Sequence, residues 1–299
     1  MVKSLTNICV SVGLLLGLNA CTQDTVTHTA NSTDAAEPAQ TLRIAAAANL
    51  SDVLPTIIES YQTDKDVYEQ DTLDIEVTYA SSGKLYAQIQ AGAPYDIFLS
   101  ANQAFPARLA AENISSDMDD SSDINNTDST RTLTEPFTYT KGQLALYSVT
   151  KPLVSLRPVI EKGTLGADDW ITLVDSSKIT IANPDLAPYG ASAKAYLQAQ
   201  GIYDTLDASK RLIQSENIGQ AFQYAHTGSV DYGFVAQSQL VAIKAKPEQF
   251  ITLPAASYPA ILQDGIVIND TAPATAFTDY LRSKAGQQYF LQAGYLSVQ

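Results

Sequence analysis

The chain has 299 residues and a formal net charge of −14 at pH 7, and hydrophobic residues make up 45% of it. A protein this acidic repels the phosphate backbone of nucleic acids, which excludes DNA and RNA as partners. Its length is sufficient for two modest domains or one large domain. Any anion that it binds must be held by local groups, because the field of the whole protein opposes anion binding.

The first twenty residues have the layout of a secretory signal peptide. Lys3 precedes an apolar run at 8–18 that is too short to span a bilayer as a permanent helix. The segment 18–21 (LNAC) is similar to a bacterial lipobox, in which the cysteine is lipidated and becomes the first mature residue. We expect residues 1–20 to be removed and Cys21 to anchor the protein in the periplasm or at the cell surface. Simple secretion and an uncleaved anchor are the alternatives.

Two segments are too polar to bury in a core. Residues 21–41 contain almost no large apolar side chain and are expected to form a flexible tether behind the lipid anchor. Residues 112–135, with the run SSDMDDSSDINNTDST, are expected to be an acidic loop insertion at the surface. The only cysteine besides Cys21 is Cys9, within the signal peptide, so the mature chain has neither a disulfide nor a thiolate metal site.

The remaining sequence alternates between strand-like and helix-like segments. Residues 73–79 show the two-residue period of a strand, whereas the apolar residues of 50–61 recur at helical spacing. Further short apolar runs of strand length lie at 42–48, 97–99, 144–147, 179–181, 232–235 and 266–268. This alternation predicts an α/β fold in which helices cover both faces of mainly parallel sheets.

Small or hydroxyl-bearing residues stand at the starts of four predicted helices, at 48–51 (ANLS), 81–84 (SSGK), 188–191 (PYGA) and 217–219 (NIG). The first N–H groups of a helix lack partners and carry a partial positive charge. Several such ends converging at the carboxyl ends of strands would form an anion pocket without any Lys or Arg. Asn and Ser are also ordinary helix caps, so the spacing alone leaves plain capping and anion binding both open.

At these residues the chain resembles the periplasmic molybdate-binding proteins, the receptors of bacterial molybdate ABC importers. The resemblance runs from about residue 42 to the C-terminus, and it is carried by IAAAANLSDVL, YASSGKLYAQIQAGAPYDIFLSAN, IANPDLAPYGASAKAYL, ENIGQAF and YGFVAQSQL. It implies a two-lobed periplasmic-binding-protein fold of type II, with a mostly parallel sheet in each lobe and crossover strands between the lobes. Lobe 1 would comprise 42–143 and 264–299, and lobe 2 would comprise 144–263.

The resemblance also implies the ligand-binding residues. Asn49 stands where the first loop of the family presents Ser or Asn to the oxyanion, and Ser82 matches the second hydroxyl ligand. Tyr189 and Ile218 match positions whose main-chain N–H groups, and sometimes a Tyr hydroxyl, face the oxyanion from the other lobe.

One position departs from the family pattern. Some members carry a ligand-binding Tyr just after the GFV-like strand, where this chain has Ala236. Tyr189 is the natural substitute, since members that pair Asn with Tyr form a recognisable variant. The secondary candidates for ligand contact are Ala48, Gly83, Gly190 and Ala236 itself.

The function implied is reversible capture of molybdate and tungstate and delivery to a membrane permease. We expect a monomer that is not an enzyme, with no cofactor and no metal other than the metal centre of the oxyanion. The rival hypotheses are another tetrahedral oxyanion such as sulfate or phosphate, ferric iron, an enzyme on the same bilobal fold, and a surface adhesin. An enzyme would need an acid/base or nucleophile constellation that the sequence does not offer.

Three further ionisable residues invite a functional interpretation. Lys84 could pair with an anion, but one turn into a helix it is expected to point to solvent. His226 is expected at the surface, and with no second His in the folded region it can build neither a triad nor a zinc site. Asp96 is expected to have a structural hydrogen-bonding role.

Overall fold

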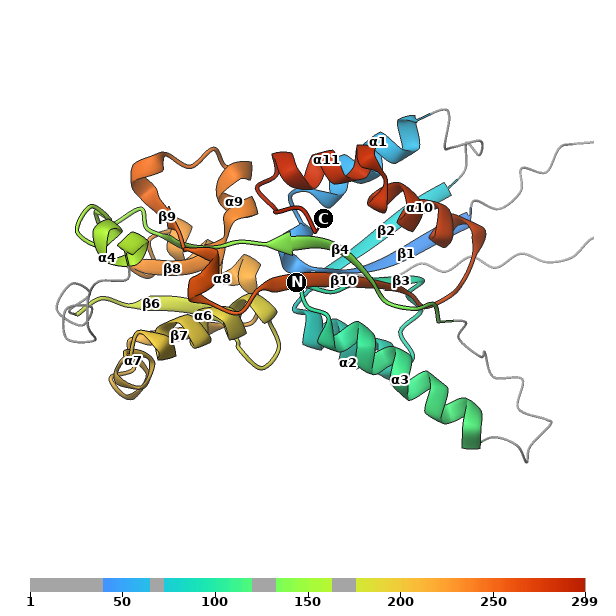
Figure 1. Cartoon of the computed structure of the whole chain (residues 1–299), viewed down its shortest axis with the longest axis horizontal. Coiled ribbons are helices and arrows are strands. Elements are labelled where there is room, and N and C mark those ends of the chain that lie inside the picture. The colour runs from blue at the N-terminus through green and yellow to red at the C-terminus, as the bar shows by residue number, and fades with distance from the viewer. Residues whose placement is uncertain (1–39, 65–72, 120–132, 163–175, 299) are drawn as a thin grey trace, which may run out of the picture. The chain divides into compact units, whose positions relative to one another are not determined.

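Two five-stranded sheets form the framework of the protein (Figure 1). The computed structural model describes residues 40–64, 73–119, 133–162 and 176–298. The predicted signal peptide, Cys21 and nearly all of the predicted tether lie outside the described residues. Residues 40 and 41, which the sequence assigns to the tether, belong to the first strand.

The first sheet has the order β2-β1-β3-β10-β4. Its strands are β1 (Gln40–Ala47), β2 (Leu73–Ala80), β3 (Ile97–Leu99), β4 (Phe137–Gly142) and β10 (Ile261–Val267). β1 pairs in parallel with β2 and β3, whereas β10 runs antiparallel to both β3 and β4. β10 is therefore the one strand of this sheet that opposes the other four.

Helices cover both faces of the first sheet. Successive side chains of β1 point to opposite faces, and each face carries apolar side chains that the helices bury. Leu42 and Ile44 pack in a cluster with α1 (Leu54–Thr63), α10 (Ala272–Arg282) and α11 (Lys284–Gln292). Ala45 faces the opposite cluster with α2 (Ser82–Gln90) and α3 (Ala104–Asp119). We call this sheet with its helices lobe 1.

The second sheet has the order β7-β6-β8-β5-β9. Its strands are β5 (Leu144–Tyr147), β6 (Ile179–Ala182), β7 (Leu212–Ser215), β8 (Tyr232–Ala236) and β9 (Phe250–Thr252). β6 pairs in parallel with β7 and β8, and β5 runs antiparallel to β8 and β9. The second sheet thus repeats the pattern of the first, with β5 as the opposing strand.

Lobe 2 is this sheet with its helices, again packed on both faces. Leu146 packs with α4 (Arg157–Lys162), α6 (Pro188–Ala199) and α7 (Tyr203–Ala208). Tyr147, the next residue, packs with α8 (Ile218–His226) and α9 (Gln237–Ala242) on the other side. Short 3₁₀ turns are η1 (Ala48–Leu50), η2 (Pro247–Gln249) and η3 (Ala255–Ser257).

Two crossings connect the sheets, and both lobes belong to one unit of the structure. β4 ends at Gly142 and β5 begins at Leu144, whereas the return runs from the end of β9 to Ile261 (Figure 1). The predicted α/β fold with two lobes and crossover strands is confirmed. The sheets are mixed, however, because the crossing strands place antiparallel neighbours beside the parallel strands.

The structure also shifts two predicted boundaries. The predicted lobe boundary between 263 and 264 falls inside β10, which pairs with β4 from Ile261 onward. α3 continues to Asp119, into the range 112–135 that the sequence predicts as a loop, because residues 107–119 contain neither Gly nor Pro to end the helix. Residues 120–132 lie outside the described part. In that part, no helix is both long and apolar enough to cross a membrane.

Candidate functional site

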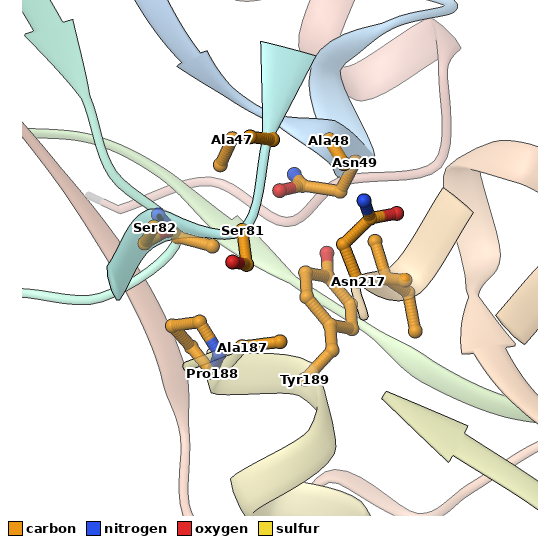
Figure 2. Close-up of a pocket in the computed structure, with 12 residues that line it drawn as sticks. Ala47, Ala48, Asn49, Ser81, Ser82, Ala187, Pro188, Tyr189 and Asn217 are labelled. Atoms are coloured by element: carbon orange, nitrogen blue, oxygen red, sulfur yellow. Dashed lines mark hydrogen bonds between the residues drawn. The ribbon is translucent and has the colours of Figure 1, made fainter. Parts of the chain in front are cut away.

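A small pocket lies where the carboxyl ends of β1 and β2 in lobe 1 face the starts of α6 and α8 in lobe 2 (Figure 2). Its volume, including the open mouth, is about 200 Å³. It is lined by Ala47, Ala48, Asn49, Ala80, Ser81, Ser82, Ala101, Ala187, Pro188, Tyr189, Asn217 and Ile218. The structure thus brings together all four segments predicted as helix starts, although 48–51 forms the 3₁₀ turn η1 and α1 begins only at Leu54. No charged side chain lines the space among the residues described.

The predicted candidates divide into two groups. Asn49, Ser82, Tyr189, Ile218 and Ala48 line the pocket, whereas the other three secondary candidates are absent from its lining. These three have packing or main-chain roles that the sequence pattern does not reveal.

The two glycines among them serve the close approach of neighbouring elements. The N–H of Gly83 donates to the carbonyl oxygen of Leu186 at 2.9 Å, so this group of α2 is already satisfied across the two lobes. A Cβ on Gly190 would lie 2.1 Å from the carbonyl oxygen of Ala182, because α6 passes directly over the end of β6. Gly190 is therefore required for packing.

The main-chain N–H of Ala236 donates to Oε1 of Gln239 at 2.9 Å, and Ala236 is fully buried. Some members of the resembling family have a ligand-binding Tyr at this position. The methyl group of Ala236 has no polar atom, so it cannot replace that Tyr hydroxyl. Among the pocket residues described, Tyr189 has the only phenol.

Two adjacent serines offer hydroxyl groups from the start of α2. Ser82 Oγ accepts a hydrogen bond from the N–H of Ala101 at 2.9 Å, so its own proton is available to another acceptor. Ser81 Oγ is buried and has no hydrogen-bond partner among the described residues. Sequence reasoning missed Ser81 as a site residue, although its position beside Ser82 in the run SSGK could have indicated it.

The side-chain amide of Asn49 is held by hydrogen bonds to other residues of lobe 1. Its Nδ2 donates to Oε1 of Gln263 and to the hydroxyl of Tyr295, both at 3.0 Å, while the Tyr295 hydroxyl donates to the Asn49 carbonyl at 2.7 Å. Asn49 Oδ1 has no partner in the described part of the chain. A buried acceptor without a partner costs about 1–3 kcal/mol, and only a bound group with a proton to donate would recover it.

Tyr189 extends from the start of α6 with its hydroxyl directed towards Asn49 (Figure 2). The residue is only 1% exposed, and its hydroxyl oxygen accepts a hydrogen bond from Gln263 Nε2 at 3.2 Å. Burial raises the pKa of Tyr189 well above its usual range, so the group is a neutral O–H donor at ordinary pH.

The start of α8 presents main-chain donors. The side chain of Asn217 accepts from the N–H of Gln220 at 3.0 Å and so caps the helix. The N–H of Ile218 belongs to the first turn, where helical N–H groups have no partner within the helix. The same holds for the first N–H groups of α2 and α6, at Ser82 and Tyr189.

An ion pair joins the two lobes near the starts of α2 and α8. Lys84 is exposed, as predicted, and is absent from the pocket lining, while its Nζ lies 2.5 Å from a carboxylate oxygen of Glu216. The sequence pattern of α2 could not reveal this partner, which lies just before α8. Both side chains are about half exposed, and such a pair contributes at most about 1 kcal/mol to stability.

The other ionisable candidates have structural contacts. Asp96 accepts hydrogen bonds from the N–H of Arg43 at 2.7 Å and from the side chain of Asn269 at 3.1 Å. His226 is exposed, with its Nδ1 2.9 Å from the hydroxyl of Tyr147. Within the described ranges, no three His, Cys, Asp or Glu side chains cluster in a way that could hold a metal ion.

The three tyrosines buried around the site make stability depend on pH. Burial raises the pKa of Tyr139, Tyr189 and Tyr295 in the folded protein. In the unfolded chain each loses its proton near pH 10, so their stabilising contribution is present below pH 10 and is lost as pH rises above it. We expect the free energy of unfolding to fall by about 1.4 kcal/mol per pH unit for each such tyrosine. Urea unfolding between pH 8 and 11 measures this; a flat profile would contradict the burial of these hydroxyls.

Known proteins are similar to this chain in sequence and, in one case, in fold. A molybdate-binding protein of Rhodobacter capsulatus is 30% identical over 226 residues, covering 74% of this chain and 77% of the relative. A candidate ABC transporter substrate-binding lipoprotein of Bacillus subtilis is 27% identical, with 89% of each chain covered. The solved periplasmic molybdate-binding protein of Azotobacter vinelandii superposes with a TM-score of 0.67 and 27% identity, over 86% of this chain and all of its own.

The family model for bacterial extracellular solute-binding proteins matches residues 42–296. This range includes every residue that lines the pocket and both sheets except the first two residues of β1. This is a family of binding proteins, in agreement with the prediction that the chain is not an enzyme. By its sequence and its fold, the chain belongs to the bacterial extracellular solute-binding protein family.

Proposed function

We propose that this protein captures molybdate or tungstate outside the cytoplasm and delivers it to the permease of an ABC importer. The observation that carries the proposal is the convergence of Ser82, Tyr189 and the starts of α2, α6 and α8 on one small pocket between the lobes. The molybdate-binding relatives from Rhodobacter capsulatus and Azotobacter vinelandii support the choice of ligand.

Neutral groups can hold a dianion in this pocket. Hydroxyl and main-chain N–H groups that donate to an ionised acceptor form hydrogen bonds roughly twice as strong as neutral pairs. The helix starts add their partial positive charges, and they do so in a protein whose net charge of −14 would otherwise repel the ligand. No lysine or arginine is needed among the lining residues.

The size of the pocket supports a small ion. The space inside it that a water-sized sphere can reach is about 10 Å³, far below the roughly 300–1,000 Å³ of pockets that enclose drug-sized molecules. Selection against sulfate follows from the same geometry, because a smaller anion cannot reach donors that approach from both lobes. Each donor left buried without an acceptor costs about 1–3 kcal/mol, which favours the larger oxyanion.

Asn49 supports the site chiefly through its bonds to other residues. Both contacts of its Nδ2 are to the protein, so the amide braces Gln263 and Tyr295 behind the pocket wall. For the side chain to donate directly to the ligand, the amide would have to turn and give up these two bonds. We therefore assign Ser82 and Tyr189 as the principal side-chain donors, with the hydroxyl of Ser81 as a third.

Membrane anchoring through Cys21 is part of the proposal. The lipobox-like segment LNAC and the resemblance to a Bacillus subtilis lipoprotein support it, and a monomeric receptor is sufficient for the function. Labelling with a radioactive fatty acid tests the anchor. Incorporation into the wild type and its loss in Cys21→Ala are expected, whereas equal labelling of both would place the modification elsewhere.

A thermal-shift panel tests the ligand directly. A ligand at a hundredfold excess over its Kd stabilises the folded state by about 2.7 kcal/mol, which raises the Tm of a protein this size by about 5–10 °C. We expect that rise with molybdate and tungstate and none with sulfate or phosphate at the same concentration. A larger rise in Tm with sulfate or phosphate would overturn the assignment of molybdate as the ligand. No rise in Tm with any oxyanion would overturn the proposed function.

A further inference from the structure

We propose that Gln263 is a positioning residue that directs the hydroxyl proton of Tyr189 into the pocket. This inference rests on the proposed function, since it concerns how the same pocket donates to an oxyanion. Gln263 is fully buried on β10 and does not line the pocket itself. Its side chain joins Asn49 of lobe 1 to Tyr189 of lobe 2.

The hydrogen-bond directions follow from one end of the network. The Tyr295 hydroxyl donates its only proton to the main-chain carbonyl of Asn49 at 2.7 Å. Towards the Asn49 side chain it can therefore act only as an acceptor, so the Asn49 amide must present Nδ2 to it. The orientation of the Asn49 amide is thus fixed by the main chain.

The same logic fixes the amide of Gln263. Its neighbour Asn49 Nδ2 is a donor, so Gln263 must present Oε1 to it, at 3.0 Å. The hydroxyl of Tyr139 lies 3.1 Å from the same oxygen but 2.9 Å from the carbonyl oxygen of Ser100. It has one proton for two acceptors, so the bond from Asn49 sets the orientation. The Gln263 Nε2 then faces Tyr189 and donates to its hydroxyl oxygen at 3.2 Å.

Tyr189 is left with a proton and no protein acceptor for it within the described residues. Because its oxygen accepts from Gln263, its own O–H must point elsewhere, and the free direction is the pocket that it lines. If Gln263 presented its oxygen to Tyr189, the Tyr189 hydroxyl would donate to Gln263 and would no longer point its proton into the pocket. Gln263 thereby converts a rotatable phenol hydroxyl into a directed donor before the ligand arrives, which lowers the ordering cost of binding.

The backbone around Gln263 holds it in this position. β10 and β4 pair with a register shift between Gln263 and Asp264, which leaves Tyr139 of β4 as the extra residue of a bulge. Bulges commonly redirect a side chain beside a functional site. Gly142, at the crossing between the lobes, leaves the space that both Gln263 Nε2 and the Tyr189 hydroxyl occupy.

A double-mutant cycle on the full-length mature protein tests the inference. Molybdate affinity is measured by calorimetry for the wild type, Tyr189→Phe, Gln263→Met and the double variant, with Tm recorded for each. Each single substitution is expected to weaken binding about 10- to 100-fold, because each removes one directed donor to a charged ligand. Since Gln263 acts through Tyr189, the double variant is expected to bind within about threefold of the weaker single variant.

Tyr258→Phe is the matched control. Its hydroxyl is also buried and accepts a hydrogen bond from the N–H of Leu144 at 3.1 Å, but it does not line the pocket. Adding it to Gln263→Met is expected to leave affinity unchanged.

The possible outcomes separate the two proposals. If the wild type binds but the losses of Tyr189→Phe and Gln263→Met multiply, Gln263 acts independently and the inference is overturned while the function stands. Equal coupling of Gln263→Met to Tyr258→Phe would show a general structural role and overturn it as well. If the wild type binds no molybdate at all, the function fails and the inference falls with it.

Discussion

Replacing Ser82 and Asn49 together by alanine is expected to weaken molybdate binding by about 10²- to 10⁴-fold. Ser82 loses the hydroxyl whose proton remains free once Ala101 has donated to its oxygen. Loss of a donor to a charged partner costs about 1.5–3 kcal/mol. Asn49→Ala removes the group that orients Gln263, so the directed donor at Tyr189 is lost as well. The two losses act on different lobes and should add.

Calorimetry with molybdate measures this effect, and urea unfolding of the same variant separates it from a loss of stability. Ser257→Ala is the control, because its hydroxyl bonds to the carbonyl oxygen of Pro254 and does not line the pocket. It should bind like the wild type. Unchanged affinity in the folded double variant would mean that the oxyanion site is not at this pocket.

Gly142→Ala is expected to abolish tight binding although it changes no residue of the pocket lining. A Cβ at this position would lie 2.2 Å from the Tyr189 hydroxyl and 2.8 Å from Gln263 Nε2. Both groups would have to move, and such overpacking of a buried site costs about 1–3 kcal/mol of stability. The displaced phenol could no longer donate into the pocket, so we expect at least a tenfold loss of affinity.

Combining Gly142→Ala with Tyr189→Phe distinguishes the two consequences. The phenylalanine removes the 2.2 Å contact with the hydroxyl, so part of the lost Tm should return. Affinity should remain low, because no hydroxyl is present to donate. Recovery of full affinity in this double variant would show that Tyr189 does not contact the ligand through its hydroxyl.

The predicted residues that the structure places at the pocket come from segments read in the sequence as helix starts. Asn49, Ser82, Tyr189 and Ile218 each stand within a short local pattern, and parallel strands bring their carboxyl ends to one edge of a sheet. Capping chemistry and the order of the elements are encoded in neighbouring residues. That is why local motifs were sufficient to locate the pocket.

The supporting network escaped prediction because its partners are distant in the chain. Gln263 and Tyr295 reach Asn49 across 214 and 246 residues, and no local pattern marks either as a site residue. The same reason accounts for Lys84, whose partner Glu216 is 132 residues away. The sequence also cannot show whether a glycine near the site contacts the ligand or allows close packing. Gly190 allows α6 to pack against Ala182.

If the protein works as proposed, a molybdate ion is bound between the lobes by neutral donors. Diffraction data collected at the molybdenum absorption edge, from crystals grown with molybdate, would test it most directly. We expect one strong anomalous peak inside the space lined by Ser81, Ser82, Tyr189 and Ile218, with the Tyr189 hydroxyl oxygen at hydrogen-bond distance from a ligand oxygen. A peak elsewhere on the protein, or an empty pocket at saturating molybdate, would contradict it.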